Sequence, residues 1–452
     1  MRLPFRSTRL LALALVTAVV PVTVLAGGGQ SAVAAARSVT AAPEIPDSPA
    51  GKQLTWFLDA LSRTPIAESE YQEHFTADFL KAVPVDELNK SAKALKGLTL
   101  EKLVVVQPTL LQGTATLGDQ RYNLMISVDA DGRINGLQVP PEQPPLPGPK
   151  DWKELDARLR TVAPDVGFLA AEIDARGRCQ VVHGVAVDRP QPLGSIFKLY
   201  VLGAVAEKIR DGKLSWNTKV TIRPEWKSPS EGGIWERPDN SKISVREAAK
   251  LMISISDNTA ADILLHTVGR GAVEAKVRQW SDHASLNIPF LTTREWGLLK
   301  AVDYPRQART YLALDTAGRR AYLRKTVAKQ SIEDAKPWTE PREIDTLEWF
   351  GSPRDVCRAY AGLSKLYSKQ LNETLSGFDG LDLDPKKWPT VWFKGGSELG
   401  VLDLAYLGRS ARGKTYVVTA LANNPRKALE DSATVPQLVS LTKGSFSLVK
   451  GR

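Results

Sequence analysis

Apolar residues recur at helical spacing in the first part of the chain and then give way to short strand-like runs. One face of a predicted helix over residues 53–61 carries four apolar side chains: Leu54, Phe57, Leu58 and Leu61. The runs that follow predict four strands, over residues 103–106, 114–117, 122–128 and 134–139, with a turn at 129–132. Helices followed by an antiparallel meander predict a small α+β domain.

A second pattern begins at about residue 150. It predicts a helix over 152–162 and a β-hairpin over 167–174 and 179–184. Helical spacing dominates from residue 195 to about 370, and three strand-like runs return at 390–394, 401–408 and 415–422. We therefore predict one five-stranded antiparallel sheet made from both ends of this segment, with a helical subdomain between them.

A proline-rich stretch separates the two patterns. Six of the ten residues in 140–149 are prolines, which fix extended backbone and form a stiff linker. Before the first domain, an uncharged apolar run over 10–26 follows three arginines and precedes small residues. This arrangement predicts a signal peptide over 1–36, with a membrane anchor as the alternative. The two domains are then predicted over 37–139 and 150–452.

Composition restricts the class of protein. The chain has 452 residues, 43% of them hydrophobic, which is typical of a globular protein rather than a disordered one. The formal net charge is +10, but the basic residues are spread along the chain, so a nucleic-acid partner is not predicted. A basic exported protein instead suits contact with anionic cell-envelope material such as peptidoglycan.

Cysteines and histidines offer little metal chemistry. Cys179 and Cys357 either form a disulfide in an oxidising compartment or remain two buried thiols. The four histidines are scattered and lack metal-ligand spacing, which argues against a zinc hydrolase. No metal site and no cofactor are predicted.

The first candidate site is the tetrad Ser195-Ile196-Phe197-Lys198, which precedes an apolar helix. Ser195 would lie near the helix N-terminus, with Lys198 one turn later on the same face. A serine hydroxyl becomes a good nucleophile when a base takes its proton, and a lysine with a lowered pKa can serve. Taken alone, the tetrad favours the alternative of a helix-capping serine beside a solvated lysine.

Two further segments carry chemistry. Ser256-Asp257-Asn258 lies at a predicted junction between two helices, where Ser256 could relay a proton and Asn258 could hold Lys198 and a substrate amide. Asp257 is expected to point away and tie the loop together; helix capping is the alternative for the whole triplet.

The third segment, Lys394-Gly395-Gly396-Ser397, ends a predicted strand. Its glycines would let a ligand approach the strand edge beside a positive charge, and the Ser397 amide would be a second oxyanion donor beside that of Ser195. An ordinary glycine turn is the alternative.

Together, the three segments in this order resemble the motif set of class A β-lactamases and penicillin-binding proteins. The resemblance covers roughly residues 165–445. It implies that Ser195 is the acylated nucleophile, Lys198 its base, and Ser256 a proton relay. It also implies that Asn258, Lys394, Gly396 and Ser397 bind the substrate.

Two departures from the family pattern concern substrate binding and deacylation. Gly395 replaces the usual hydroxyl residue of the third motif, so carboxylate binding would rest on Lys394 and Ser397. The family's Glu-x-x-Leu-Asn string is absent, and Glu295 is the nearest candidate for the deacylating residue, a helix-start acid being the alternative. An Arg/Lys-rich insertion over about 301–343 could rim the cleft.

The two-domain build resembles an actinobacterial group that joins a cone-shaped domain of the steroid-isomerase and nuclear-transport-factor-2 type to a β-lactamase-like domain. One member is encoded with clavulanic acid biosynthesis, and the group is associated with weak cephalosporin-ester hydrolysis. In the first domain, Asp59 and His74 are interpreted as surface or capping residues rather than an acid–base pair.

The resemblance predicts a secreted, monomeric serine hydrolase acting on β-lactams or on esters attached to them, with a role in the response to antibiotics or their catabolism. Two alternatives stay open. One is a penicillin-binding protein of the D,D-carboxypeptidase kind, and the other is a non-catalytic binding protein of the cell envelope.

Overall fold

The computed structural model describes residues 43–142, 145–228, 233–377 and 380–449. The predicted signal peptide lies outside these residues. The described chain divides into two compact units, one over 43–142 and one over the remainder. Within the described residues, no helix combines the length and the apolar character that a membrane span requires.

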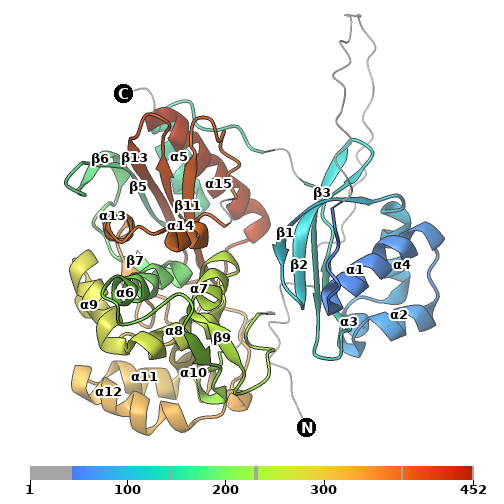
Figure 1. The fold of residues 1–452 in the computed structure, drawn as a ribbon, viewed down its shortest axis with the longest axis horizontal. Coiled ribbons are helices and arrows are strands. Elements are labelled where there is room, and N and C mark those ends of the chain that lie inside the picture. The colour runs from blue at the N-terminus through green and yellow to red at the C-terminus, as the bar shows by residue number, and fades with distance from the viewer. Residues whose placement is uncertain (1–42, 143–144, 229–232, 378–379, 450–452) are drawn as a thin grey trace, which may run out of the picture. The chain divides into compact units, whose positions relative to one another are not determined.

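The N-terminal unit packs four helices against a four-stranded antiparallel meander of order β1-β2-β3-β4 (Figure 1). The helices are α1 Pro49–Ala60, α2 Glu68–His74, α3 Ala77–Ala82 and α4 Val85–Ala94. The strands are β1 Thr99–Val106, β2 Leu110–Leu117, β3 Gln120–Val128 and β4 Ile134–Gln138. The helical face that the sequence predicts at Leu54 and Phe57 is buried against this sheet.

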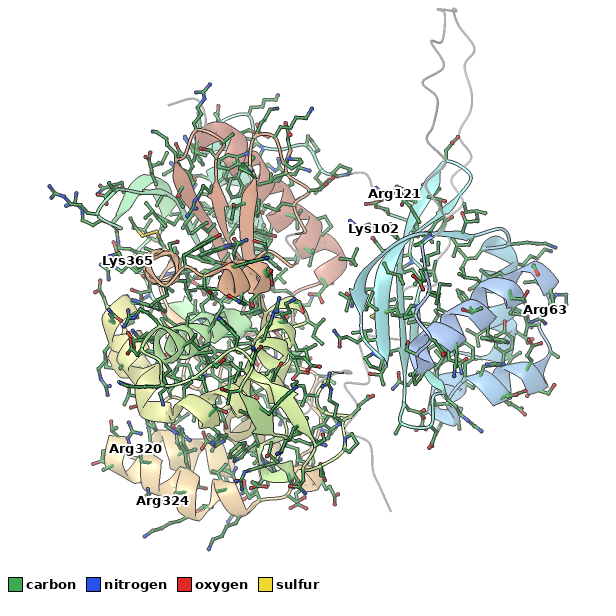
Figure 2. The ribbon with its side chains drawn as sticks, in the orientation of Figure 1. Arg63, Lys102, Arg121, Arg320, Arg324 and Lys365 are labelled. Atoms are coloured by element: carbon green, nitrogen blue, oxygen red, sulfur yellow. A yellow bond between two sulfur atoms is a disulfide. The ribbon has the colours of Figure 1, made fainter. Side chains whose placement is uncertain are left out.

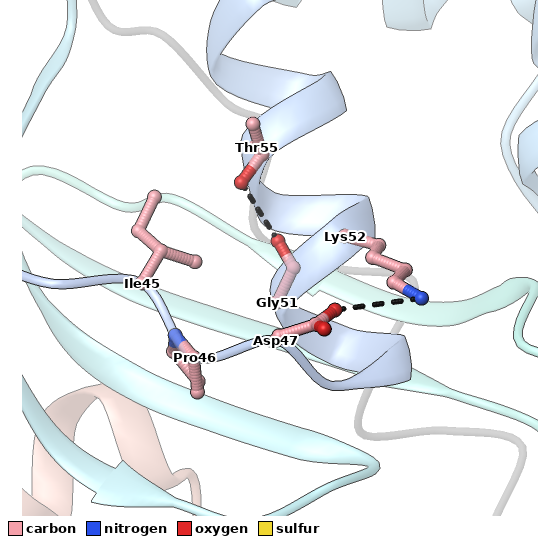
Figure 3. A pocket seen from close by; sticks show the side chains of 6 residues that line it. All are labelled: Ile45, Pro46, Asp47, Gly51, Lys52 and Thr55. Carbon is pink, nitrogen blue, oxygen red and sulfur yellow. Dashed lines mark hydrogen bonds and ion pairs between the residues drawn. The ribbon is translucent and has the colours of Figure 1, made fainter.

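Helix α1 begins four residues earlier than its apolar pattern predicts. Ser48 caps it, since its hydroxyl accepts a hydrogen bond from the Gly51 amide, and Pro49 occupies the first position, where no amide donor is needed. A surface hollow adjoins this helix start, beside the exposed ion pair of Lys52 and Asp47 (Figure 3). The hollow's described lining contains no nucleophile paired with a base.

The C-terminal unit is built on a five-stranded antiparallel sheet of order β11-β12-β13-β5-β6 (Figure 1). Its strands are β5 Asp165–Ile173, β6 Cys179–Val185, β11 Thr390–Glu398, β12 Val401–Arg409 and β13 Thr415–Asn423. The first two and the last three strands of the segment therefore meet in one sheet, which confirms the predicted α+β architecture. Strand β11 is longer than predicted and continues through Glu398, because its pairing with β12 extends to Val401.

Each face of this sheet is covered by helices because alternate residues of a strand point to opposite faces. Phe168 and Ala170 of β5 join the core beneath α5 Trp152–Val162 and α15 Asp431–Leu448. Leu169 and Ala171 join the larger core on the other face, which includes α13 Pro353–Lys365. A disulfide between Cys179 of β6 and Cys357 of α13 ties the hairpin to that second face, which resolves the alternatives for the two cysteines.

The helical subdomain fills the middle of the segment. Its helices are α6 Lys198–Arg210, α7 Val245–Ser254, α8 Asn258–Val268, α9 Arg270–Trp280, α10 Thr293–Ala301, α11 Arg306–Leu312, α12 Thr316–Lys325 and α14 Lys369–Leu375. Two short strand pairs that the sequence pattern did not predict are β7 Gln191–Pro192 with β10 Phe350–Gly351, and β8 Lys219–Thr221 with β9 Lys242–Ser244. The basic insertion forms α11 and α12, and Arg320 and Arg324 project from α12 (Figure 2).

Candidate active site

Ser195 lies in a tight turn that leads into a buried helix. Residues Gly194–Phe197 form a 3₁₀ turn, and α6 begins at Lys198. Gly194 adopts a positive φ of 44°. A Cβ there would lie 2.8 Å from the Ser397 amide nitrogen, so only glycine permits this approach to β11. The turn is thus pressed against the strand that carries the third motif.

The Lys198 side chain is the centre of the site. It is fully buried, and its Nζ lies 3.1 Å from Ser195 Oγ and 2.8 Å from Asn258 Oδ1. Two further contacts are to Ser256, at 2.5 Å from the carbonyl oxygen and 3.1 Å from Oγ. The structure thereby brings Lys198 together with Ser256 and Asn258, which lie 58 and 60 positions further along the chain.

Burial favours the uncharged form of both lysines in the site. It lowers the pKa of Lys198 to about 7, although the buried carboxylates of Asp257 and Asp262 act in the opposite direction. Burial also lowers the pKa of Lys394 well below its usual value, and the neighbouring charge of Lys198 adds to this effect. A neutral amine at Lys198 is therefore well populated near neutral pH.

The junction between α7 and α8 holds Ser256 in an unusual backbone conformation. Its φ is 59°, a left-handed value that costs a non-glycine residue free energy and persists where the surroundings impose it. The buried Asp257 next to it accepts hydrogen bonds from the amides of Ala260 and Ile234, at 2.7 and 2.8 Å. Asp257 therefore ties the loop together, and its role as the α8 cap coexists with the cluster rather than replacing it.

Strand β11 contributes Lys394 to the same cluster of contacts. Lys394 Nζ lies 3.0 Å from Ser256 Oγ, so this hydroxyl contacts both lysines. A Cβ at Gly396 would lie 2.1 Å from the Leu193 carbonyl and 3.0 Å from the Ser195 amide nitrogen, so the strand and the nucleophile turn are in close contact. Gly395 and Gly396 lie within the strand rather than in a glycine turn, and Ser397 is exposed.

Glu295 is not drawn into this cluster. It forms a capping box with Thr292 at the start of α10, and its carboxylate accepts hydrogen bonds from the Arg270 guanidinium at 2.7 and 2.9 Å. These contacts correspond to the helix-start alternative for this residue. A long-range partner such as Arg270 cannot be inferred from a local capping pattern, which explains why the sequence left the role of Glu295 open.

Other residues singled out in the sequence lie apart. In the N-terminal unit, Asp59 pairs with Arg63, whereas His74 stacks on Trp56 and contacts Gln53. Asp59 and His74 therefore do not share a hydrogen bond in the described structure. Among the described residues, no group of three or more His, Cys, Asp or Glu side chains is arranged to hold a metal ion.

A buried cluster of Lys300, Glu348 and Glu398 was not predicted from the sequence. Its members come from α10, the segment before β10, and the last residue of β11. The available signal at Glu398 was a charged residue at the end of a strand that contains four buried residues. Nothing in the sequence pairs Glu398 with Lys300 or Glu348.

Comparison with known proteins agrees with this architecture. Residues 153–344 match the Beta-lactamase enzyme family, and residues 45–134 match the family described as ORF 12 gene product N-terminal. The C-terminal unit has a β-lactamase-like fold with a five-stranded antiparallel sheet, and the N-terminal unit combines helices with a small sheet.

One curated relative is the beta-lactamase regulatory protein BlaB of Streptomyces cacaoi. It is 29% identical over 98 residues, which make up 22% of this chain and 31% of that protein. The chain thus spans about a third of the length of the curated relative it matches.

Similar solved structures include PBP-A, which is 17% identical, covers 68% of this chain and all of its own, and has a TM-score of 0.42. A β-lactamase from Chitinophaga pinensis is 16% identical over 66% of this chain and 98% of its own, with a TM-score of 0.42. A β-lactamase from Sphaerobacter thermophilus is 17% identical over 66% of this chain and 97% of its own, with a TM-score of 0.43.

Proposed function

We propose that the C-terminal unit is a serine hydrolase that acts through an acyl-enzyme on Ser195, with β-lactams or esters attached to them as substrates. One observation carries the proposal: the fully buried Lys198 amine contacts the Ser195 hydroxyl, the Ser256 hydroxyl and Asn258 Oδ1. A solvated lysine beside a capping serine, the alternative for the tetrad, would not be buried in this way.

The hydrogen-bonding capacity of Lys198 favours proton abstraction. A neutral amine has two N–H donors and one lone pair. The Ser256 carbonyl and Asn258 Oδ1 can only accept, so they take both donors. The lone pair is then left for a hydroxyl proton, and Ser195 Oγ lies 3.1 Å away. Lys198 acts as the general base while Ser195 Oγ bonds to the substrate carbonyl carbon.

Ser256 carries the proton onward to the leaving group. Its Oγ lies between the two amines, 3.1 Å from Lys198 and 3.0 Å from Lys394. A proton taken by Lys198 can therefore pass to the departing nitrogen or oxygen through this hydroxyl. Lys394 and the Ser397 hydroxyl receive the substrate carboxylate, since Gly395 offers no hydroxyl of its own.

The developing oxyanion is held by backbone amides. The close contact between the nucleophile turn and β11 brings the amides of Ser195 and Ser397 near each other. Two such donors fixed in position stabilise the tetrahedral intermediate without reorganising. Gly396, which permits the contact, serves substrate binding through backbone geometry rather than through a side chain.

Deacylation separates the main proposal from its alternative. Glu295 is engaged by Arg270 and Thr292, so the water that frees Ser195 would need another activator. A slow release would make the protein a long-lived acyl-enzyme, as in a penicillin-binding protein of the D,D-carboxypeptidase kind. The similarity to a beta-lactamase regulatory protein favours, as second candidate, a β-lactam-responsive protein that uses acylation as its signal.

The cellular setting completes the proposal. The Cys179–Cys357 disulfide supports an oxidising, extracytoplasmic location, in agreement with the signal peptide that the sequence predicts. We propose a monomer with access to peptidoglycan, whose N-terminal unit, of the nuclear-transport-factor-2 type, binds or positions a ligand. The resemblance to the clavulanic-acid group favours a cephalosporin ester among the substrates.

The decisive experiment compares the protein with a Ser195→Ala variant. Both are incubated with a chromogenic 3′-acetoxy cephalosporin and with a penicillin, while ring opening, acetate release and intact mass are followed. A hydrolase gives turnover that depends on Ser195, whereas a penicillin-binding or regulatory protein gives a persistent adduct without turnover. Absence of both adduct and turnover would rule out the serine acyl-enzyme.

A further inference from the structure

A buried ionic cluster lies at the end of β11. Lys300 Nζ lies 2.6 Å from Glu348 Oε1 and 2.9 Å from Glu398 Oε1. The side chains of Lys300, Glu348 and Glu398 are 0%, 1% and 8% exposed. Trp296 closes the cluster: its indole N–H donates to Glu348, and its ring lies 4.7 Å from the Lys300 ammonium. Such a site is costly to bury unless its partners are fixed in position.

One arm of the cluster belongs to the active-site strand. Glu398 directly follows Ser397, and because side chains alternate along a strand it shares a face with Lys394 and Gly396. This is the face that packs against the nucleophile turn, where Gly396 approaches the Ser195 amide. The position of Glu398 therefore fixes the end of the strand beside the proposed oxyanion donor.

The other arm belongs to the segment that supports the nucleophile. Glu348 precedes Trp349, whose ring stacks on Phe197 with centroids 3.9 Å apart. The Trp349 carbonyl also accepts a hydrogen bond of 2.8 Å from the Leu193 amide. Trp349, the residue next to Glu348, thus contacts the chain on both sides of Ser195, through the Leu193 amide and the Phe197 ring.

The charges in the cluster are balanced when one glutamate is protonated. Burial and the neighbouring Glu348 raise the pKa of Glu398 well above its usual value. Burial alone would lower the pKa of Lys300, but Glu348 and Glu398 together raise it. The single Lys300 amine thus bridges two buried carboxyl groups, one from each arm of the cluster.

We propose that the bond from Lys300 to Glu398 is a positioning device for acyl transfer, which holds the strand of Ser397 at a fixed distance from the turn of Ser195. Lys300 joins the strand that carries the Ser397 donor to the segment of Glu348 and Trp349, which supports the turn of Ser195. It therefore acts on the reacting atoms through these segments without touching substrate. The inference rests on the proposed function of Ser195, and it assigns three residues that the motif set does not contain.

The test uses a matched pair of variants at one position. Glu398→Gln keeps an acceptor for Lys300, whereas Glu398→Leu removes it and leaves the charge-balanced Lys300–Glu348 pair. Acylation by the chromogenic cephalosporin is measured in single turnover, and intact penicillin binding is measured in a Ser195→Ala background. Affinity for an arylboronic acid, which forms a tetrahedral adduct on the serine, reports on the oxyanion donors.

We expect Glu398→Leu to slow acylation and weaken boronate binding at least ~10-fold, a part of the effect of deleting an oxyanion donor. Penicillin binding to the Ser195→Ala protein should stay unchanged, and Glu398→Gln should acylate close to the unaltered rate. Glu207→Leu, which removes the ion-pair partner of the buried Lys276 in another part of the unit, is the control for leaving a buried lysine without its carboxylate.

Two results would overturn the inference: an unchanged acylation rate in a folded Glu398→Leu variant, or equal losses of acylation and penicillin binding. If Glu398→Leu does not fold, the double variant Lys300→Met with Glu348→Gln is used instead, because it removes the bond from Lys300 to Glu398. The same slower acylation and weaker boronate binding are expected for it. If the unaltered protein forms no Ser195 adduct, the proposed function itself fails, and the inference falls with it.

Discussion

Replacing Asn258 by aspartate tests the electrostatics of the proposed base. Asn258 Oδ1 lies 2.8 Å from Lys198 Nζ, so Asn258→Asp puts a carboxylate against the buried amine with almost no change of shape. In the unaltered protein, burial lowers the pKa of Lys198 from 10.5 to about 7. That fall corresponds to ~5 kcal/mol against the protonated amine.

The carboxylate introduced by Asn258→Asp stabilises the protonated Lys198 amine and so opposes this free-energy cost. At an effective dielectric constant of 20, opposite charges at this distance attract by about 6 kcal/mol. Desolvation of the carboxylate cancels part of this, and such contacts raise a lysine pKa by about 1 to 3 units. The pKa of Lys198 should therefore rise to about 8 to 10, and the neutral base at pH 7 should fall by about 5- to 500-fold.

The assay is single-turnover acylation by a chromogenic cephalosporin between pH 5.5 and 10. The unaltered protein should show a rate that rises through about pH 7, where Lys198 loses its proton, and Asn258→Asp should move this midpoint upward and recover at high pH. Asn258→Ala, which adds no charge, should lose rate without an upward midpoint. A loss of equal size at every pH for Asn258→Asp would refute the assignment of Lys198 as the base.

Folding stability should follow the same titration. The Lys198 pKa is lower in the folded state than in the unfolded state, so between about pH 7 and 10.5 the unfolded chain binds more protons. The contribution of Lys198 to stability therefore rises with pH across this window and is at its most unfavourable below it. In Asn258→Asp the folded-state pKa of Lys198 is higher, so the pH range between its folded and unfolded pKa values becomes narrower. The gain in unfolding free energy between pH 6 and pH 9, measured with urea, should therefore be smaller than in the unaltered protein.

Four further predictions concern the frame around the site. Gly396→Ala should slow acylation by about 10²- to 10³-fold, because its Cβ would press the strand away from the nucleophile turn; stopped-flow rates measure this. Ser256→Gly should be about 1 kcal/mol more stable than Ser256→Ala in urea unfolding, since φ is 59°, while both lose the relay hydroxyl and its activity. Replacing Cys179 and Cys357 by serine should cost about 2–5 kcal/mol of stability and lower Tm, with little change in acylation once folded. Glu295→Gln should lower Tm by weakening its bond with Arg270 yet leave deacylation unchanged by mass spectrometry; a selectively longer-lived adduct would restore Glu295 as a deacylating residue.

Local patterns determined much of the fold. Periodicity of 3.6 located α5 at 152–162, and short strand-like runs located all nine main strands of the two sheets, because the residue types that favour each element lie close together in the sequence. The motif segments also lie where local chemistry predicts: Ser195 at a helix start, and Ser256 between α7 and α8. Their order along the chain was enough to suggest the fold.

Tertiary structure alone decided how these segments act on one another. The pKa of Lys198 depends on complete burial and on oxygens from residues about 60 positions away, which no local pattern encodes. The same holds for the partner of Glu295, the pairing of the two cysteines, and the contact that Gly396 permits. Sequence patterns report which face of each element is apolar, whereas distances between elements are set by long-range packing, and the proposed chemistry depends on those distances.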